Sequence, residues 1–399
     1  MRFSLLLVVA VILAIAVSAS SGVDEAADTS VLMFIGGYTR DEGWVHGKSK
    51  GVYTFAFFPG NGTLKEISVL DVGLNPTFLR GTKAGKKKQF LYAINECAEA
   101  SRDFPGTTTG YVVALEVGMD GKLKLLNRME TRGPGPAHVS VSPNDDFVAV
   151  SLYGGGGVIL YPIQADGSLA PPSDSHFYKG GSGAAPSQDA AHLHSTTWVP
   201  GGTNVVFAAD LGNDQIVQYK FDPSSKKLGT TTLPIIKRPP GSGPRHMALH
   251  PSGNVAYVVD EISNTIGVYP LNADSKSLSL STIQRISTLP SGFTQSSSSA
   301  DIHVSADGKF VYTSNRGHNS IAIFKVTSQT TGILERIGTE PTRGQTPRSF
   351  LVYNDYLIVA NQDTDTIEVF RRNADGTLTH TGNSVSSSTP VSLYIPSTV

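Results

Sequence analysis

Short apolar runs alternate with polar turns along almost the whole chain. Residues 255–259 and 266–269, for example, are rich in β-branched and aromatic side chains and flank a polar segment. Other runs are separated by turn pairs such as Asp307-Gly308. Runs of this composition, bounded by such turns, indicate antiparallel strands joined by hairpins. The pattern therefore predicts an all-β protein built from many short strands.

These runs fall into units that recur about every 45 to 60 residues, with three or four runs in each unit. The six internal units begin near Thr77, His138, His194, Pro244, Ala300 and Pro347. A period of this length with four strands per unit is typical of the blades of a β-propeller. A solenoid is the alternative, but it needs polar capping repeats at both ends and the sequence shows none.

The two ends of the repeat region complement one another. Residues 390–395 resemble the innermost strand of a blade, and no further strands follow them. Residues 31–38 resemble the second strand of a blade, with 51–57 and 64–70 as its third and fourth. We expect the C-terminal strand to complete the N-terminal blade, because this pairing leaves no open sheet edge. The prediction is a seven-bladed β-propeller of four-stranded antiparallel blades, forming one domain over 31–399.

Composition agrees with this fold and narrows the class of partner. The 399 residues include 41 glycines and 23 prolines, only 16% of residues are charged, and the formal net charge is −1. Frequent turns account for the glycine and proline content. A near-zero net charge argues against nucleic acid or an anionic membrane as partner, because both attract a basic surplus.

The first thirty residues are predicted to lie outside the propeller. Arg2 precedes an uninterrupted apolar run over 5–17, and small residues follow at 17–19. This arrangement is typical of a secretory signal peptide, here residues 1–20, followed by a short leader over 21–30. We therefore expect a secreted protein with no membrane association after cleavage. Asn61-Gly62-Thr63 is a candidate N-glycosylation sequon, and Cys97, the only cysteine, excludes an intrachain disulfide.

Equivalent positions in successive blades must lie on common rings around the central channel. The residues that enter the inner strands are predicted to be Pro76, Ala137, His194, Arg245, Ala300 and Arg348. The residues that end the second strands are predicted to be Tyr38, Glu96, Tyr153, Leu211, Glu261, Arg316 and Gln362. Both rings belong to the same mouth of the channel, so three arginines, two glutamates and a histidine should meet there.

Such a cluster suits a small anionic substrate. Arginines bind carboxylate or phosphate through charge-assisted bonds, and a neighbouring histidine or glutamate can move a proton. The predicted catalytic residues are His194, Arg245, Glu261 and Arg316. The predicted substrate-binding residues are Arg348, Glu96, Gln362, His246 and Asp301. His138, His246, Asp260 and Asn315 have an alternative role in hydrogen bonds between blades, and His250 and His318 are expected on surface turns.

Other chemistries find little support in the sequence. It contains no Gly-x-Ser-x-Gly elbow, no Walker loop, no His-Glu-x-x-His motif and no cysteine pair. His192 and His194, with Asp189, form a weak alternative as metal ligands on a loop. We expect neither a metal nor an organic cofactor.

Three segments resemble a known family. They are Gly36-Gly37-Tyr38-Thr39, then 243–247 with His250-Pro251, and 300–303 with Asp307-Gly308. All three resemble the lactonase family of seven-bladed propellers, which includes bacterial-type 6-phosphogluconolactonases and fungal carboxy-cis,cis-muconate cyclases. The resemblance extends over about residues 31–395.

The resemblance implies lactone chemistry without a cofactor. The active site proposed for the cyclase branch contains a histidine, two arginines and a glutamate, which look like His194, Arg245, Arg316 and Glu261 here. The implied reaction is hydrolysis of a sugar lactone or, as the alternative, closure of a muconate to its lactone. The arginines would hold the anionic group, and Glu261 or His194 would act as general base or acid. A secreted propeller that binds a small anion without catalysis is the third possibility.

Overall fold

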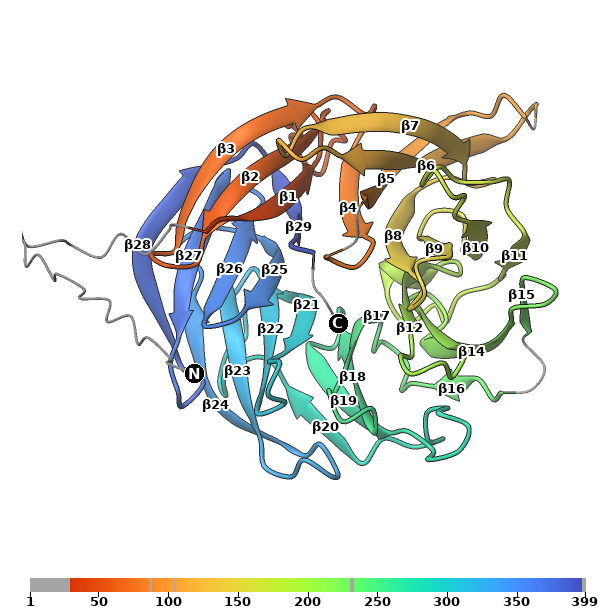
Figure 1. Cartoon of the computed structure of the whole chain (residues 1–399). Helices are drawn as coiled ribbons and strands as arrows, with labels where there is room; N and C mark the ends of the chain where they lie inside the picture. The colour runs from red at the N-terminus through yellow and green to blue at the C-terminus, as the bar shows by residue number, and fades with distance from the viewer. Residues whose placement is uncertain (1–28, 86–87, 104, 230–232, 397–399) are drawn as a thin grey trace, which may run out of the picture.

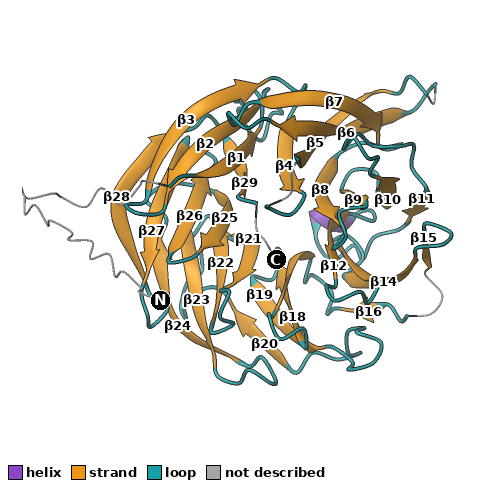
Figure 2. Ribbon diagram, in the orientation of Figure 1, coloured by secondary structure: helices purple, strands orange, loops and turns teal. Residues whose placement is uncertain are grey.

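The computed structural model describes residues 29–85, 88–103, 105–229 and 233–396. The predicted signal peptide over 1–20 and most of the predicted leader lie outside the described residues. The described chain forms seven antiparallel sheets arranged as blades around a central channel (Figures 1 and 2). The predicted all-β propeller is confirmed. One short 3-10 helix, η1 (Pro186–Gln188), interrupts the β structure of the described residues. No helix among these residues has the length and apolar character needed to cross a membrane.

Each blade is ordered from the channel outward. The first blade contains β29 (Pro390–Tyr394), β1 (Val31–Gly37), β2 (Val52–Phe58) and β3 (Thr63–Leu70), and the second contains β4 (Pro76–Gly81), β5 (Gln89–Ala100), β6 (Thr108–Val117) and β7 (Leu123–Glu130). The third blade contains β8 (Pro136–Val141), β9 (Phe147–Leu152), β10 (Gly157–Pro162) and β11 (Asp174–Phe177). The fourth contains β12 (Leu193–Trp198), β13 (Val205–Asp210), β14 (Gln215–Asp222) and β15 (Lys227–Gly229). The short strand β16 (Ile236–Lys237) also pairs with β14, so the fourth blade carries two pieces at its outer edge.

The remaining three blades follow the same order. They contain β17 (Pro244–Leu249), β18 (Val255–Asp260), β19 (Thr265–Pro270) and β20 (Gln284–Ser287); β21 (Ser298–Val304), β22 (Phe310–Arg316), β23 (Ser320–Val326) and β24 (Leu334–Pro341); and β25 (Pro347–Tyr353), β26 (Tyr356–Asn361), β27 (Thr366–Arg372) and β28 (Leu378–Ser386).

The ring closes through the two ends of the chain. Strand β29 pairs antiparallel with β1, with Phe34 opposite Tyr394 and Ile35 opposite Leu393. The C-terminal strand thus supplies the innermost strand of the N-terminal blade, as predicted. β1 therefore has neighbours on both sides, and its inner edge is paired like that of the second strand in every other blade.

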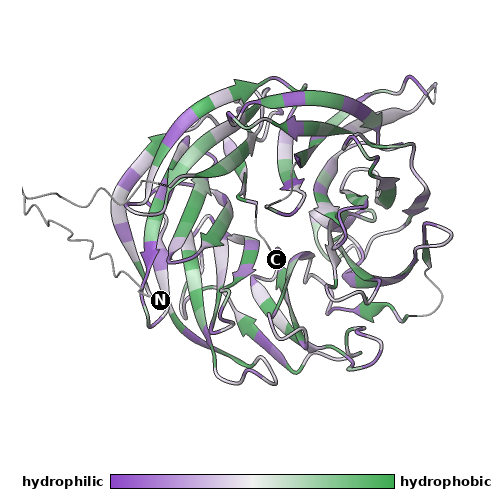
Figure 3. Ribbon diagram, in the orientation of Figure 1, coloured by the Kyte–Doolittle hydropathy of each residue, from purple (hydrophilic) through white to green (hydrophobic). Residues whose placement is uncertain are grey.

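The core lies between neighbouring blades. Apolar side chains of one sheet pack on those of the next, as where Tyr92 and Ile94 of β5 meet Val148 and Val150 of β9. Figure 3 shows hydrophobic residues running through the strands and hydrophilic residues concentrated at outer strands and turns. Burial of these faces is the main force that holds adjacent blades together.

Buried tyrosines add a repeated polar link between blades. The hydroxyls of Tyr92, Tyr257 and Tyr312 donate to the carbonyls of Gly167, Gly332 and Gly376 in the next blade, at 3.0, 3.0 and 2.9 Å. These three glycines have φ values of 88°, 72° and 88°, a conformation that disfavours side chains. The turn carbonyl is thereby aimed at the neighbouring blade.

The expectation that His250 lies on the surface is wrong. Its side chain is 3% exposed, with Nε2 3.0 Å from the Gly308 carbonyl of the next blade and Nδ1 2.8 Å from the Ser252 hydroxyl. The turn that carries it is covered by the neighbouring turn. His250 therefore links two blades, whereas His318 is partly exposed.

Candidate active site at one mouth of the channel

The backbone at the start of the inner strands positions the first ring of side chains. Five of these strands begin with a proline preceded by a residue of positive φ: Asn75, Gly135, Gly243, Thr346 and Thr389. Proline is tolerated at the first position of a strand, where its missing N–H costs no ladder bond. The pairing register with the second strand then shifts by one residue. Each inner strand therefore starts with a β-bulge, a device that re-aims a side chain.

The bulges present one residue from each of six blades to the channel. These residues are Thr77, Ala137, His194, Arg245, Arg348 and Val391. All six line the narrowest part of the channel. In the sixth blade the shift spans two residues, Ala300 and Asp301. The predicted ring is right at Ala137, His194, Arg245 and Arg348. In the second blade Thr77 holds the position expected for Pro76, and in the sixth blade Ala300 does not line the constriction with the others.

A second ring is tied to the first through the backbone. The amide of Glu261 donates to the carbonyl of Gly243, two residues before Arg245, at 2.7 Å. Equivalent bonds join Glu96 to Asn75 at 2.9 Å and Gln362 to Thr346 at 3.0 Å. These bonds hold the end of each second strand beside the start of the adjoining inner strand. The two predicted rings therefore lie at the same mouth.

Glu261 is the centre of the charged cluster. Its Oε2 atom accepts hydrogen bonds from Arg245 Nε at 2.8 Å and is 3.0 Å from Arg316 Nη2. Oε2 also lies 3.9 Å from His194 Nε2. The Glu261 side chain is 21% exposed, whereas that of Arg245 is 3% exposed. The structure thus brings the four predicted catalytic residues together around one carboxylate oxygen.

Burial and charge set the protonation states of this cluster. Burial alone would raise the pKa of Glu261, but Arg316, Arg245 and Arg348 outweigh it and lower that pKa below its usual value. The pKa of His194 lies well below its usual value, mainly because the side chain is buried and secondly because Arg245 is positively charged. Burial and the neighbouring Arg316 lower the pKa of Arg245 to about 9. At neutral pH the site therefore holds a carboxylate, a neutral imidazole and charged guanidinium groups.

Arg348 belongs to a second hydrogen-bonded group at the same mouth. Its Nη2 donates to the Tyr38 hydroxyl at 3.1 Å, and that hydroxyl donates to Glu96 Oε2 at 2.9 Å. Thr77 donates to the same Glu96 oxygen at 2.7 Å. The Arg348 guanidinium also lies 5.5 Å from the Tyr38 ring and 5.4 Å from the Trp44 ring. Glu96 thus acts through Tyr38 to hold Arg348 in place.

These groups surround a cavity of about 400 Å³, called here the Glu261 cavity. Its lining consists of Trp44, Glu96, Ala137, Tyr153, His194, Glu261, Arg316 and Arg348. The volume lies within the range of small-molecule sites. Two of the lining residues are aromatic. Tyr153 belongs to the predicted second ring, whereas Trp44 was not predicted at this mouth.

Trp44 is unusual because it is 59% exposed at the rim of this cavity. It lies in the loop between β1 and β2, which backbone bonds from Glu42 to Val45 and from Gly47 to Arg40 hold in shape. The Tyr38 ring meets Trp44 edge-on, with centroids 5.1 Å apart. Only its place after Tyr38, in the loop that leaves the channel mouth, could have pointed to it in the sequence.

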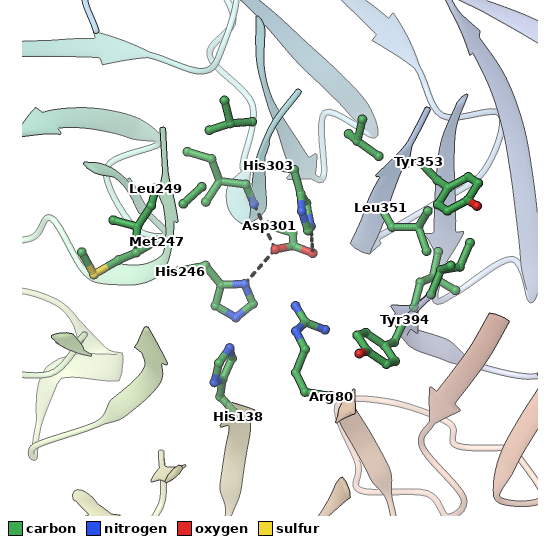
Figure 4. Close-up of a pocket in the computed structure, with 16 residues that line it drawn as sticks. Arg80, His138, His246, Met247, Leu249, Asp301, His303, Leu351, Tyr353 and Tyr394 are labelled. Carbon is green, nitrogen blue, oxygen red and sulfur yellow. Dashed lines mark hydrogen bonds and ion pairs between the residues drawn. The ribbon is translucent and has the colours of Figure 1, made fainter. Parts of the chain in front are cut away.

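The remaining predicted binding residues lie elsewhere. Gln362 donates to Asp363 at 2.8 Å, and its buried Oε1 has no hydrogen-bond partner among the described residues. His246 and Asp301 line a different cavity, of about 540 Å³, at the opposite mouth (Figure 4). Between the two cavities the channel narrows to a space of about 10 Å³ lined by Phe78, Arg245 and His246 among others. His246 and Asp301 therefore do not line the Glu261 cavity.

Two predicted alternatives can be placed as well. Asp260 pairs with Arg238 and accepts from Thr265, and Asn315 donates to the Thr288 carbonyl at 3.1 Å, so both have structural partners. His192 uses both ring nitrogens, Nδ1 at 2.7 Å from the Tyr153 carbonyl and Nε2 at 3.1 Å from Asp189. In the described part of the chain, no group of three or more potential ligand residues is placed to hold a metal ion.

Comparison with known proteins identifies the family. Residues 32–395 match the family model described as "Lactonase, 7-bladed beta-propeller". The chain belongs to the lactonase family of seven-bladed β-propellers. The predicted resemblance is confirmed over essentially the range expected from the motifs.

Individual relatives agree with this membership. The chain is 33% identical to a 6-phosphogluconolactonase of Bacillus subtilis over 367 residues, which cover 91% of this chain and 97% of the relative. It is 32% identical to a 6-phosphogluconolactonase of Formosa agariphila, over 86% of this chain and 93% of the relative. Among solved structures, a periplasmic gluconolactonase of Pseudomonas aeruginosa superposes with a TM-score of 0.81 at 28% identity, over 93% of this chain and 100% of that one. The chain is therefore a lactonase-family protein similar to 6-phosphogluconolactonases.

Proposed function

We propose that the protein hydrolyses a small anionic sugar lactone in the Glu261 cavity. The observation that carries this proposal is the clustering of Arg245, Arg316 and His194 around a single Glu261 oxygen at the wall of a ligand-sized cavity. The relatives named 6-phosphogluconolactonase support lactone opening as the reaction class.

In the proposed mechanism the arginines bind charge. Arg348 and Arg316 line the cavity, so their guanidinium groups receive the anionic group of the substrate and the oxygen that becomes negative during reaction. Arg245 is committed to Glu261 and to the Ala300 carbonyl. Its role is to fix Glu261, which in turn keeps Arg316 aimed at the cavity.

His194 is the proposed general base. Its imidazole is neutral because burial lowers its pKa, whereas Glu261 is held as a carboxylate by two arginines and has little tendency to take a proton. His194 Nε2 and Glu261 Oε2 are 3.9 Å apart, which is too long for a direct hydrogen bond. Both residues line the cavity, so a water placed beside them in the cavity can contact both groups. This water is the proposed nucleophile.

The bond changes follow from this arrangement. The water oxygen forms a bond to the lactone carbonyl carbon while a water proton passes to His194 Nε2. The carbonyl oxygen takes up negative charge beside Arg316 or Arg348. Collapse of this intermediate breaks the ring C–O bond, and the leaving oxygen takes the proton from His194. The product is the open hydroxy acid.

The test is a substrate panel assayed with the purified protein. Opening of 6-phosphogluconolactone, opening of glucono-δ-lactone and cyclisation of 3-carboxymuconate are measured for the wild type and for Arg245→Ala and Glu261→Ala. Arg102→Ala, which removes an exposed arginine remote from the channel, serves as the matched control. We expect lactone opening in the wild type and the control and a loss of at least about 100-fold in both site variants.

The outcomes separate the candidate functions. Cyclisation without lactone opening would replace the hydrolase proposal with a cycloisomerase. No turnover of any of the three compounds would favour a non-catalytic binding propeller. Activity that survives both site variants would reject the Glu261 cavity as the site. Faster opening of 6-phosphogluconolactone than of glucono-δ-lactone would indicate that Arg316 and Arg348 bind the phosphate group of the substrate.

We also propose that the protein is secreted after cleavage near residue 20. The N-terminal sequence supports this, and Asn61 of the sequon is exposed on a turn, where it can accept a glycan. Expression of the full-length chain in a secreting eukaryotic host, followed by intact mass and N-terminal sequencing, tests this proposal. Retention inside the cell with residues 1–20 still attached would contradict it.

A further inference from the structure

The opposite mouth of the channel contains a cavity that the proposed reaction does not use. It has a volume of about 540 Å³ and is called here the Asp301 cavity. The last residues of three inner strands, Leu249, Val304 and Tyr353, contribute to its wall. An adjoining hollow of about 480 Å³ shares Arg80, His138 and Tyr394 with it. A constriction of about 10 Å³ beside Arg245 lies between this cavity and the Glu261 cavity.

Asp301 looks at first like a cation-binding group, but its oxygens are already occupied. Oδ1 lies 2.9 Å from His246 Nδ1 and accepts the Ile302 amide at 3.0 Å. Oδ2 lies 3.3 Å from His303 Nε2 and accepts the Ser349 hydroxyl at 3.1 Å and the Phe350 amide at 3.4 Å. Burial alone would raise the pKa of Asp301, but His303 and His246 outweigh it and hold that pKa well below its usual value. The carboxylate is therefore ionised and saturated, and it fixes the two rings.

Arg80 is the group in this cavity whose bonding is incomplete. Its Nη1 donates to the Leu79 carbonyl at 2.8 Å, and its guanidinium lies over the Phe78 ring at 4.5 Å and near the Tyr394 ring at 5.8 Å. Among the described residues, no carboxylate oxygen lies within ion-pairing distance of it. Of the other enclosed arginines considered above, Arg238, Arg245 and Arg316 each pair with a carboxylate. Arg348, which lines the Glu261 cavity, instead donates to the Tyr38 hydroxyl. An enclosed guanidinium without such a partner is costly unless an anion accompanies it.

His138 adds a second donor. The Thr196 amide donates to His138 Nδ1 at 3.4 Å, and burial lowers the pKa of this histidine well below its usual value. The ring is therefore neutral and carries its proton on Nε2. Figure 4 shows the His138 ring, the His246 ring and the Arg80 guanidinium gathered in front of Asp301. The free polar atoms of Arg80 and His138 are donors, which is the chemistry that an anion requires.

We propose that the Asp301 cavity is a second binding site, for a small organic anion whose carboxylate or phosphate group pairs with Arg80 and accepts a hydrogen bond from His138. The remainder of such a ligand packs against Leu249, Leu351 and Tyr353 in the same wall. This site goes beyond the proposed lactone hydrolysis, because it lies on the other side of the constriction.

Calorimetric titration at low ionic strength tests the proposal, with inorganic phosphate in one arm and malonate in the other. The wild type, Arg80→Gln, Arg80→Lys, Arg348→Gln and the exposed-arginine control Arg102→Gln are compared. We expect two anion sites in the wild type and the control. Arg80→Gln weakens one site by about tenfold or more, and Arg348→Gln weakens the other. Arg80→Lys, which keeps the charge, retains part of the binding.

If phosphate binds to the Arg80-dependent site more tightly than malonate, the ligand's anionic group is a phosphate. If malonate binds more tightly, the group is a carboxylate. Thermal melts of each variant, with a midpoint close to that of the wild type, exclude misfolding as the cause of a loss. If Arg80→Gln distorts the channel, Arg80→Lys and His138→Gln carry the test, because both preserve size and polarity. Binding curves that are the same for the wild type and the Arg80 variants in both arms would overturn the proposal.

Discussion

At the scale of single residues, Glu261 determines how the charges of the channel mouth are arranged. One of its oxygens serves both Arg245 and Arg316, and its charge also acts on Arg348. Without this carboxylate, three guanidinium groups would face one another in a poorly hydrated space. Three arginines can therefore lie together at the cavity only because the negative charge of Glu261 offsets their positive charges.

The protonation state of His194 leads to a prediction about the pH dependence of activity. Burial lowers the pKa of His194, so the imidazole remains neutral below the ordinary histidine value of about 6.5. We expect the acid limb of kcat/KM for lactone opening to lie well below pH 6.5. His194→Asn should lower kcat by about 10²- to 10⁴-fold and remove this limb. A limb at or above pH 6.5, or a profile that His194→Asn leaves unchanged, would argue against His194 as the base.

Trp44 supports a prediction about substrate binding. Its exposed ring at the rim of the Glu261 cavity can pack on the apolar face of a sugar ring without contacting the reacting carbonyl. We expect Trp44→Ala to raise KM for a sugar lactone roughly two- to tenfold, with kcat within about twofold, since only uniform binding is lost.

Trp44→Phe should restore most of the affinity for the lactone. Phe177→Ala, which truncates another exposed aromatic residue on β11, is the control and should leave KM unchanged. Equal KM values for Trp44→Ala and the wild type would exclude stacking at this position.

At the scale of elements, the start of each inner strand connects local backbone conformation to the site. Gly243 has φ +65°, its carbonyl accepts the Glu261 amide, and Arg245 lies on the bulge that follows. One residue thus sets the separation between Arg245 and Glu261. The same arrangement recurs around the ring, with different side chains on the bulges.

A pair of glycine substitutions tests this connection. Gly243 and Gly253 have similar φ values of +65° and +68°, but a Cβ at Gly243 would lie 2.7 Å from Ile262, whereas nothing lies within 4 Å at Gly253. Each change to alanine should cost about 1–2 kcal/mol for the left-handed conformation. Gly243→Ala should cost about 1–3 kcal/mol more through the clash and should also reduce kcat/KM at least tenfold.

Urea unfolding and lactone assays of the two glycine variants provide the measurement. Gly253→Ala should keep wild-type activity despite its lower stability. Equal stability and equal activity of the two variants would mean that Gly243 does not set the geometry of the site.

The strands and both rings could be predicted from the sequence because blade repeats place equivalent residues at equivalent depths. Alignment of repeats could not show which side of the constriction a side chain faces. Asp301, within the two-residue register shift of β21, and His246, one position beyond the bulge residue Arg245, both line the cavity at the opposite mouth. Trp44 lies in a loop outside the repeat, so no equivalent position marks it. Both features depend on tertiary packing.

At the scale of the whole molecule, buried histidines make stability depend on pH. Burial lowers the pKa values of His138, His194 and His246, the last to about 4. In the unfolded chain each would titrate near pH 6.5. Below that pH the unfolded state takes up protons that the folded state does not, so the free energy of unfolding falls as pH falls. Above it, this contribution to stability is fully present.

We expect the urea midpoint to decrease from pH 7 to pH 5. Over this range the free energy of unfolding should fall by up to about 4 kcal/mol per pH unit, the value for uptake of three protons. His138→Gln should flatten this slope by about one proton. A midpoint that is constant over this range would contradict the assignment of neutral buried histidines.

The closure of the ring also determines when the native protein can form. Phe34 of β1 pairs with Tyr394 of β29, a partner 360 positions further along the chain. During synthesis β1 emerges early, but its inner edge must wait for almost all of the remaining blades to be made. The complete propeller can therefore form only after β29 has been synthesised and has left the ribosome. Until then the nascent chain exposes an unpaired strand edge, the kind of surface that chaperones recognise and that promotes aggregation.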